Sequence, residues 1–464
     1  MSDGPATSPT ASEAAAQLVR DSLPAGGLFA DQQWRVSPEP FRLDADIAKE
    51  LESLGRVLHQ FYKAVNLLYR KSVDGKMPAW VAQLLDQGKP SWLVELQRHA
   101  AFKNDTPRVI RPDILLTDGG FHITELDSVP GGIGLTAWLN ETYSKVGQAA
   151  LRLDADSQRE SAHPPAEPPK LIGSDRSMLD GFAGIFGSAE RVNIIVSEES
   201  AGYRPEMEWL AGKLGPRFTV HDSRFTDFRD GDSAYRFFEL FDTANVPNAR
   251  PLFDLAAERR VRLTPPPKPI FEEKMLFALL WNRNLRNFWR EELGEGFFNR
   301  LLKHVPYTWV LDPAPLPPNA AYPQLDLTDW HQLKTLSQKD RELILKVSGY
   351  SEEAWGARGV YLGSDLSQAD WSVAVDKALA AFPQSPHVLQ RFHKPRVVDS
   401  AWFDFATRQL TPMPARVRLC PYYFVHGEGD QARPHLAGVL ATICPADKKI
   451  IHGMKDAILA PCAA

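Results

Sequence analysis

Three carboxylates and one arginine occur close together in the stretch Arg111 to Gly132, which reads RPDILLTDGGFHITELDSVPGG. Two short apolar runs flank its Asp-Gly-Gly tripeptide, and this pattern predicts a β-hairpin, because glycine adopts positive φ without a Cβ penalty. With all three turn residues in the loop, the expected facing pairs are Thr117 with Phe121, Leu115 with Ile123, Asp113 with Glu125 and Arg111 with Asp127. Since strand side chains alternate between faces, the far end of one face would carry all four charged residues.

These charged residues suggest a cation site. Three carboxylates placed this close repel one another unless a cation lies among them. Asp113, Glu125 and Asp127 offer hard oxygen ligands with few soft atoms nearby, which favours magnesium over zinc. The spacing alone is equally compatible with an exposed hairpin end that is held by a salt bridge.

A second group of residues surrounds a lysine. Residues 342–348 (ELILKVS) read as an apolar strand with Lys346 near its end, and the glycine-containing segment GYSEEAWGARGVYLG follows. A strand, a flexible loop and a second strand can fold over a triphosphate, whose charge backbone amides and a lysine would neutralise. The residue order of a Walker P-loop is absent. Taken alone, the segment favours a solvent-exposed hairpin whose lysine reaches the surface.

Composition sets the class of protein. The 464 residues suffice for two or three domains with a large core, and the composition is that of a soluble globular protein. The net charge of −5 gives no reason to expect nucleic acid or a membrane as partner. The 3 cysteines form no CxxC pair and no metal-ligand spacing, so a reducing cytoplasm fits best. Residues 1–25 lack the pattern of a signal peptide, and no run approaches a membrane span.

Apolar periodicity predicts helices on both sides of the hairpin. Residues 45–70 carry one apolar stripe in steps of three and four, formed by Ile47, Leu51, Leu54, Leu58, Phe61, Val65 and Leu68. A second helical piece is expected near residues 80–85, and a third begins at about Leu135. Glycines and Ser128 precede this third helix, so its free N–H groups could receive an anion, although a tight turn explains the glycines equally well.

The middle of the chain reads as a small parallel α/β layer. A polar, proline-rich stretch at 152–170 is expected to be a loop or linker. Short strands at 192–197, 218–221 and 235–241 then alternate with helical sequence, which is typical of parallel strands. No G-x-G-x-x-G follows the first strand, so the pattern does not support a dinucleotide fold.

The last part of the chain has a mixed character. After a proline-rich boundary, a long helical region is expected from Phe271 towards Leu302. Strand-like segments follow at 387–392, 417–424 and 436–444. This order is typical of an α+β domain.

Four motifs in this order resemble the circularly permuted ATP-grasp proteins, a group that includes the synthetase part of glutathionylspermidine synthase. That family has R-x-D followed twelve residues later by E-x-N-(A)-D-(S/T), and Arg111-Pro112-Asp113 precedes Glu125-Leu126-Asp127-Ser128 with this spacing. EEKMLFALLW with Lys274 matches a lysine at the start of a helix, ILKVSGYSEEAWGARGV with Lys346 matches a strand lysine before a glycine loop, and HVLQRF with Gln390 matches the strand at the adenine edge. Each motif alone is weakly specific, whereas four in order are much more so.

The resemblance implies an ATP- and Mg²⁺-dependent ligase that joins a small-molecule carboxylate to an amine through an acyl phosphate. Asp113, Glu125 and Asp127 would bind Mg²⁺, and Lys274 and Lys346 would neutralise the α- and β-phosphates. The other implied roles are catalysis at the transferred group for Arg111, nucleotide binding for Gln390, Gly349, Gly356 and Gly359, and acceptor-carboxylate binding for Ser128, Gly131 and Gly132. The three carboxylates should then lie on one sheet face, across a cleft from the two lysines.

The sequence also departs from the family pattern. Asp127 stands where the synthases have Asn, and AGVLATICPADKK lacks the phosphate-binding arginine of their G-I-R-E-type segment. Arg416, Arg418 or Lys448 could replace that arginine. Its absence favours an alternative, a catalytically degenerate ATP-grasp protein that binds a nucleotide or a partner without turnover, whereas the retained hairpin charges and both lysines oppose it. A ligase that uses a thiol or hydroxyl nucleophile is a third possibility.

The expected fold is mixed α+β, an ATP-grasp fold in permuted order with a small parallel α/β pre-ATP-grasp layer and a helical N-terminal region. The expected divisions are a loose tail at 1–40, a helical region with the hairpin at 41–150, a linker at 151–175, the α/β layer at 176–268 and the ATP-grasp nucleotide-binding subdomains at 269–464.

Overall fold

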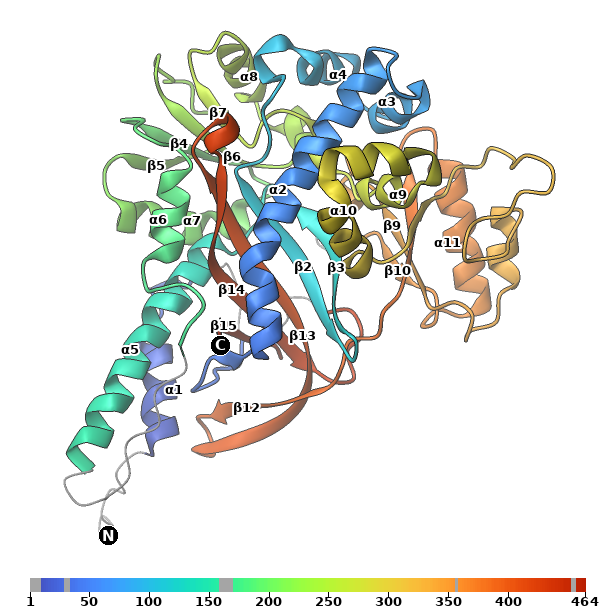
Figure 1. The fold of residues 1–464 in the computed structure, drawn as a ribbon. Helices are drawn as coiled ribbons and strands as arrows, with labels where there is room; N and C mark the ends of the chain where they lie inside the picture. The colour runs from blue at the N-terminus through green and yellow to red at the C-terminus, as the bar shows by residue number, and fades with distance from the viewer. Residues whose placement is uncertain (1–9, 29–33, 158–169, 355–357, 452–455) are drawn as a thin grey trace.

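The computed structural model describes residues 10–28, 34–157, 170–354, 358–451 and 456–464. The fold is mixed α/β and contains one sheet of seven strands and two sheets of four (Figure 1). The predicted mixed class is therefore confirmed, and so is a small parallel sheet in the middle of the chain.

The seven-stranded sheet joins sequence from both ends of the chain. Its main path runs β1 (Phe41–Arg42), β15 (Ile458–Ala463), β14 (Arg433–Pro445), β13 (Gln409–His426), β2 (Val109–Thr117) and β3 (Gly120–Asp127). β12 (Val398–Asp404) also pairs with β13. All of these pairs are antiparallel except β1 with β15. The predicted hairpin, β2–β3, is thus extended by a strand from the C-terminal part of the sequence.

Helices cover both faces of this sheet. α2 (Ala45–Val73) crosses one face (Figure 1). Its predicted apolar stripe is buried in one cluster with strand side chains such as Leu419 and Tyr423. Each of its fully buried leucines contributes about 1.5–3 kcal/mol. A Cβ on Gly55 would lie 2.5 Å from the Tyr423 ring, so glycine is required where α2 meets the sheet.

The opposite face of the same sheet packs against α5 (Ile133–Ser157) and α6 (Ser177–Gly184). Tyr422 and Phe424 alternate with Tyr423 along β13 and contact this second layer. α3 (Ala79–Asp86), which was predicted, and α4 (Ser91–Arg98) follow α2.

The parallel sheet has the order β5 (Phe218–His221), β4 (Val192–Val196), β6 (Ser233–Phe237) and β7 (Arg262–Thr264). α7 (Arg204–Leu214) and α8 (Ala249–Ala257) connect its strands. β6 ends earlier than predicted, because the residues from Leu240 form a 3₁₀ turn.

The third sheet is antiparallel, with the order β10 (Val360–Leu362), β9 (Leu343–Val347), β11 (His387–Arg391) and β8 (Thr308–Val310). α11 (Gln368–Ala381) packs on it through a separate core that includes Trp371 and Leu345. This sheet carries two of the predicted functional side chains, Lys346 and Gln390.

Helix boundaries differ from the prediction in three places. The region from Phe271 is not one helix: α9 (Leu276–Trp281) and α10 (Arg286–His304) are separate, and Lys274 lies in the turn before α9. The expected loose tail contains α1 (Ala11–Asp21), whose first turn is capped by Thr10. α5 also continues into the expected linker.

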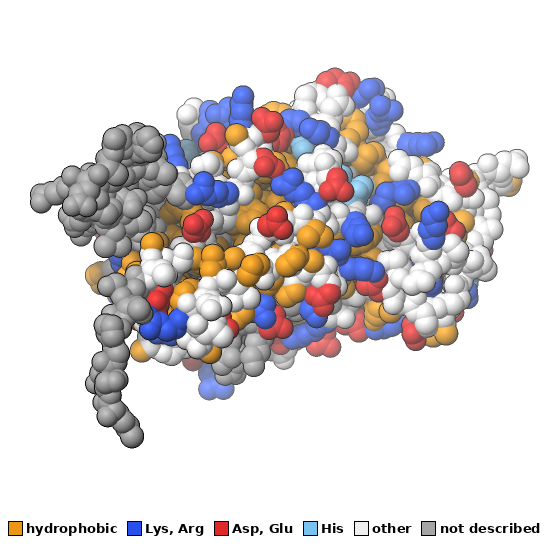
Figure 2. Space-filling view, turned by 90° about the horizontal axis from the view of Figure 1, so that it is seen from below, with side chains coloured by type: hydrophobic (Ala, Val, Ile, Leu, Met, Phe, Trp, Pro, Cys, Tyr) orange, Lys and Arg blue, Asp and Glu red, His pale blue; other side chains and the backbone are white. Residues whose placement is uncertain are grey.

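The surface seen from below carries basic and acidic side chains in a mixed arrangement, with hydrophobic side chains gathered between them (Figure 2). Within the described ranges, every helix is too short or too polar to cross a membrane. All three cysteines are buried.

Candidate functional site

The β2–β3 turn is tighter than predicted. Thr117 pairs with Gly120 and Leu115 pairs with His122, so each partner lies one residue earlier than expected. The cause is a two-residue turn in place of the predicted three-residue loop. The predicted pairs next to the turn were therefore wrong.

The charged end of the hairpin nevertheless has the predicted register. A register shift beside Asp113 restores the pairs Asp113–Glu125 and Arg111–Asp127. Thr124 is the additional residue of this bulge, and its hydroxyl donates to the Asp113 carbonyl oxygen at 3.2 Å. The bulge thus places the charged residues opposite one another despite the shorter turn.

Arg111 lies between two carboxylates. Its Nη2 is 3.1 Å from Asp113 Oδ1 and 2.9 Å from Asp127 Oδ2. A second guanidinium reaches Asp113 from β13, where Arg418 Nη1 is 3.1 Å from Oδ2. Burial alone would raise the pKa of Asp113, but the two guanidinium charges outweigh it and hold this pKa below its usual range. Among the three residues proposed to replace the missing arginine, Arg418 is therefore the one that contacts the hairpin carboxylates.

The three predicted magnesium ligands do not form a preformed metal cluster. In the described part of the chain, no group of three or more His, Cys, Asp or Glu side chains could hold a metal ion. Each carboxylate instead faces a protein cation: two arginines for Asp113, Arg111 for Asp127 and Lys274 for Glu125. The predicted repulsion is thus largely relieved by the protein itself. It remains visible at Asp127, whose pKa is raised by burial and by its two acidic neighbours against the pull of Arg111.

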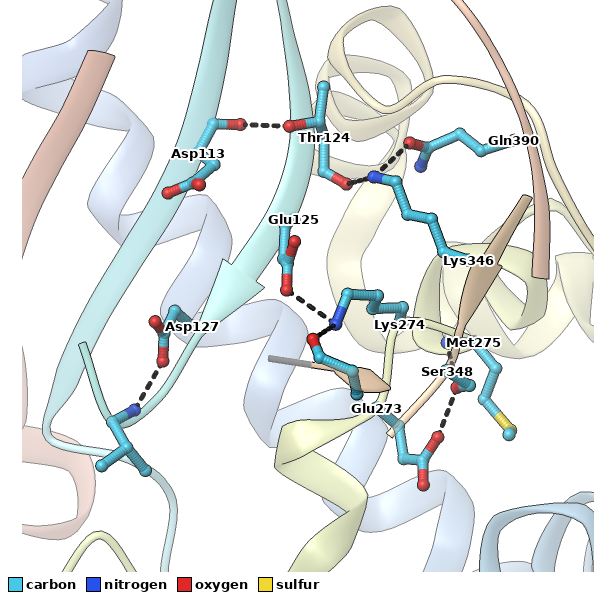
Figure 3. A network of polar contacts seen from close by, with 12 residues as sticks. Asp113, Thr124, Glu125, Asp127, Glu273, Lys274, Met275, Lys346, Ser348 and Gln390 are labelled. Atoms are coloured by element: carbon cyan, nitrogen blue, oxygen red, sulfur yellow. Dashed lines mark hydrogen bonds and ion pairs between the residues drawn. The ribbon is translucent and has the colours of Figure 1, made fainter. Parts of the chain in front are cut away.

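Both predicted lysines approach the end of β3 (Figure 3). Lys274 Nζ lies 2.8 Å from Glu125 Oε1 and donates to the Ala354 carbonyl oxygen at 2.8 Å. Lys346 Nζ donates to the Thr124 carbonyl oxygen at 3.2 Å. Side chains from three separate segments of the sequence therefore meet here.

Lys346 has neutral hydrogen-bond partners. Besides Thr124, its Nζ contacts Gln390 Oε1 at 3.1 Å, and Gln390 Nε2 donates to Thr308 Oγ1 at 3.2 Å. Burial lowers the pKa of Lys346, although the more distant charge of Glu125 opposes this shift. Both the oxygen and the nitrogen of the Gln390 amide thus form hydrogen bonds within the protein, and Gln390 orients Lys346.

The predicted glycine loop is packed closely against neighbouring backbone. A Cβ on Gly349 would lie 2.5 Å from the Glu272 carbonyl oxygen, and one on Gly359 would lie 2.7 Å from the Glu353 carbonyl oxygen. Close packing within the protein therefore explains glycine at both positions. Gly356 lies outside the described residues.

The amides at the start of α5 are occupied by a side chain of the protein. The buried carboxylate of Glu206 accepts hydrogen bonds from Gly132 N at 2.7 Å and from Leu135 N at 2.9 Å. Burial raises the pKa of Glu206 to about 7. The place expected for a bound anion at the start of this helix is thus taken by the Glu206 side chain. Gly131 presents its carbonyl oxygen to Tyr422 Oη at 2.8 Å.

Ser128 remains a candidate for substrate contact. Its side chain is buried, and its hydroxyl has no hydrogen-bond partner in the structure. A buried hydroxyl normally has a partner, so this group can serve a ligand at small cost.

Two functional candidates, Glu239 and Glu272, were not predicted from the sequence. Glu239 follows β6, and its pKa is raised well above the usual range by burial and by the nearby charges of Glu272 and Asp127. Glu272 Oε1 lies 2.6 Å from Arg236 Nη2. One available signal was the position of Glu239 at the carboxyl end of a parallel strand, where ligands often bind.

Comparisons with known proteins support the fold. The sequence matches no protein-family model and no curated protein sequence. The structure of a glutathione synthetase-like effector from Globodera pallida, in its apo form, aligns with a TM-score of 0.54 at 11% identity, over 97% of this chain and 96% of that chain. A putative gamma-glutamylcysteine synthetase from Methylobacillus flagellatus aligns with a TM-score of 0.40 at 10% identity, over 92% of this chain and 89% of that chain.

The first of these matches shows that the protein has the fold of a glutathione synthetase-like protein. At 11% identity this match concerns the fold alone, and at that level the predicted resemblance is confirmed. What the protein does must be argued from its own site.

Proposed function

We propose that this protein is an ATP- and Mg²⁺-dependent ligase that joins a small-molecule carboxylate to an amine through an acyl phosphate. The observation that carries the proposal is the approach of Lys274 and Lys346 to the carboxylate-bearing end of the β2–β3 hairpin, within a glutathione synthetase-like fold. Phosphoryl transfer depends mainly on positioned cations and needs little covalent chemistry from the protein.

Lys346 is the stronger phosphate-binding candidate. A buried ammonium whose direct partners are neutral lacks a countercharge, and a phosphate oxygen would supply it. Lys274 would bind a second phosphate group by exchanging its contact with Glu125. In this arrangement Gln390 positions Lys346, and its predicted direct role at adenine is not needed.

The residues fit a magnesium ion in part. Glu125 and Asp127 are hard oxygen donors whose side chains are 34% and 20% exposed. Asp113 fits less well, because its side chain is 10% exposed and both of its oxygens contact guanidinium groups. When bound, Mg²⁺ would offset the charge of the phosphate oxygens. We therefore propose that Glu125 and Asp127 bind the magnesium ion and that Asp113 positions the two arginines.

Arg111 and Arg418 would serve the acceptor side of the reaction. Both guanidinium groups lie beside Asp113, and a transferred phosphoryl group would receive hydrogen bonds from such fixed donors. The free hydroxyl of Ser128 would contact the acceptor carboxylate. An amine would then attack the acyl phosphate and release inorganic phosphate. We place this activity in the cytoplasm, where thiols such as those of Cys420 and Cys462 remain reduced.

An ADP-release assay with ATP, Mg²⁺ and pooled amino acids, dicarboxylates and polyamines tests the proposal. We expect ADP formation that requires both an acceptor carboxylate and an amine, and that falls at least a hundredfold in Lys346→Met. Deconvoluting the active pool identifies the substrate pair. Acceptor-independent ADP release that is equal in the wild type and in Lys346→Met would refute the ligase assignment.

The alternative is a degenerate ATP-grasp protein that binds a nucleotide or a partner without turnover. One observation favours it: in the ranges described, the three hairpin carboxylates do not form a metal cluster. ATP binding in Mg²⁺ that depends on Lys346, with no ADP formed with any acceptor pool, would establish this alternative.

A further inference from the structure

A polar cavity lies between α2, the loop before β2, the α8–β7 segment and the β13–β14 turn. Its volume is about 900 Å³, and none of the site residues described above lines it. This size is sufficient for a small-molecule ligand. The β13–β14 turn approaches β7 near the top of the fold (Figure 1), and Arg262 and Glu428 form an ion pair between them.

Cations outnumber anions on the wall of this cavity. The basic lining residues are Lys63, Arg70, Lys103, Arg108, Arg259 and Arg262. The acidic lining residues are Asp105, Glu292, Glu428 and Asp430. Two of these carboxylates are already engaged, Glu292 with Lys71 outside the cavity and Glu428 with two of the arginines. The remaining four cations form no ion pair with a carboxylate in the described residues.

The crowding of positive charge affects neighbouring groups. Arg108 has a pKa that is lowered by burial and by the charge of Arg262. His59, also on the wall, has a pKa lowered to about 4 by burial and then by Lys63 and Arg108. The cavity therefore has an excess of positive charge in a concave, partly desolvated place, where a bound anion is attracted most strongly.

The wall is held in place by buried hydrogen bonds. Asn66 Nδ2 donates to the Lys103 carbonyl oxygen at 2.9 Å, and buried Lys268 donates to the Asp105 carbonyl oxygen at 3.0 Å. Lys268 also donates to Asn66 Oδ1 at 2.8 Å. These bonds fix the loop that carries Lys103. Arg108 is fixed in turn by its hydrogen bond to the Gly427 carbonyl oxygen at 2.8 Å. Such preorganisation lowers the entropy cost of binding.

We propose that this cavity binds a small anion with two or more phosphate groups, at a site separate from the ligase centre. Arginine forks and lysine ammonium groups donate charge-assisted hydrogen bonds to phosphate oxygens, and this wall supplies both kinds. The proposal does not depend on the ligase assignment, because the two sites share no residue.

Calorimetric titration with inorganic tripolyphosphate tests this site. The test variant is Lys63→Glu with Lys103→Glu, one exposed helix residue and one exposed loop residue on the cavity wall. The matched control is Lys303→Glu with Lys339→Glu, an exposed helix residue and an exposed loop residue that do not line the cavity. A third protein, Lys346→Met, weakens the nucleotide centre and leaves the cavity intact.

We expect tripolyphosphate to bind the wild type, the control and Lys346→Met with similar affinity at the cavity. The cavity variant should bind at least tenfold more weakly, and binding should weaken as salt is added. Equal affinity in the cavity and control variants would overturn the proposal, as would loss of all binding in Lys346→Met. Tighter binding of citrate than of tripolyphosphate would overturn the phosphate assignment. Thermal unfolding of each variant shows whether it is folded.

Discussion

Lys274 Nζ lies 2.8 Å from Glu125 Oε1, so the turn before α9 is joined to the end of β3 by an ion pair. Burial alone would lower the pKa of Lys274, but the charge and hydrogen bond of Glu125 outweigh it and raise this pKa. Lys346, whose hydrogen-bond partners are neutral, has a lowered pKa for want of such a pairing. Lys274 therefore has a carboxylate partner in the protein, whereas the direct hydrogen-bond partners of Lys346 are uncharged.

Lys346→Met should separate nucleotide binding from stability. The substitution removes a buried charge, so the unliganded protein should unfold at the same temperature or a higher one. ATP affinity in Mg²⁺ should fall at least tenfold, about 1.4 kcal/mol, because a phosphate would lose its nearest ammonium. Calorimetry with ATP measures the change, and Lys339→Met, at an exposed lysine, is the control. Unchanged ATP affinity would remove Lys346 from the nucleotide site.

Asp113→Asn should destabilise the fold strongly. Asp113 lies between two largely buried guanidinium groups, with side chains of Arg111 and Arg418 exposed by 15% and 22%. Removing one partner of such a buried group costs about 3–5 kcal/mol, because a charge is left unpaired. Asp376→Asn, which breaks an exposed pair with Lys334, should cost about 0–1 kcal/mol. Urea unfolding of both variants measures the difference, and equal values would show that Asp113 has no structural part in holding the arginines.

Much of the local structure could be predicted from the sequence. The stripe of α2 depends on periodicity alone, and β4 at the centre of the parallel sheet has a strongly apolar sequence. The pair Asp113–Glu125 was predicted with the wrong turn, because a shorter turn and the bulge at Thr124 offset each other. Residue spacing does not encode such compensation.

The parts of the site that were missed depend on the tertiary fold. Arg418 reaches Asp113 only because β13 pairs with β2, and the sequence left it as one of three candidates. Glu206 lies in α7, far in sequence from the start of α5, whose amides donate to its carboxylate. A helical sequence pattern does not show which acidic residue is buried. Lys274 was matched by motif, but the turn that directs it to Glu125 was not predicted.

Glu206 should make stability depend on pH. Its pKa is raised from 4.5 to about 7 by burial, so the folded protein holds a proton that the unfolded chain releases. Stability from this group is therefore full below pH 4.5, is lost as the pH rises towards 7, and changes little above it. The loss amounts to about 3 kcal/mol.

Glu206→Gln isolates this effect, because glutamine does not titrate. The unfolding free energy of the wild type should fall relative to that of the variant between pH 5 and pH 8, as measured by urea titration at each pH. Other ionisable groups are common to both proteins and cancel in the difference. Parallel curves would mean that Glu206 has an ordinary pKa in the folded protein.

Gly132→Ala should test the tight turn that leads into α5. Gly132 has a φ of +87°, and a Cβ there would lie 2.5 Å from Tyr422 Oη. Both the backbone conformation and the contact are unfavourable for alanine, so we expect a loss of about 1–3 kcal/mol. Gly119→Ala, in the hairpin turn with nothing within 4 Å of its Cβ, should stay within about 0.5 kcal/mol.

The double variant Gly132→Ala with Tyr422→Phe separates these two causes. Removing the Tyr422 hydroxyl removes the closest atom, since the next atoms lie 3.6 Å and 3.7 Å from the position of the alanine Cβ. If the contact dominates, the double variant should lose less stability than the sum of the single variants, by about 1 kcal/mol. Additive losses would assign the cost of Gly132→Ala to the backbone conformation, because the contact with the hydroxyl would then contribute nothing to the loss of stability.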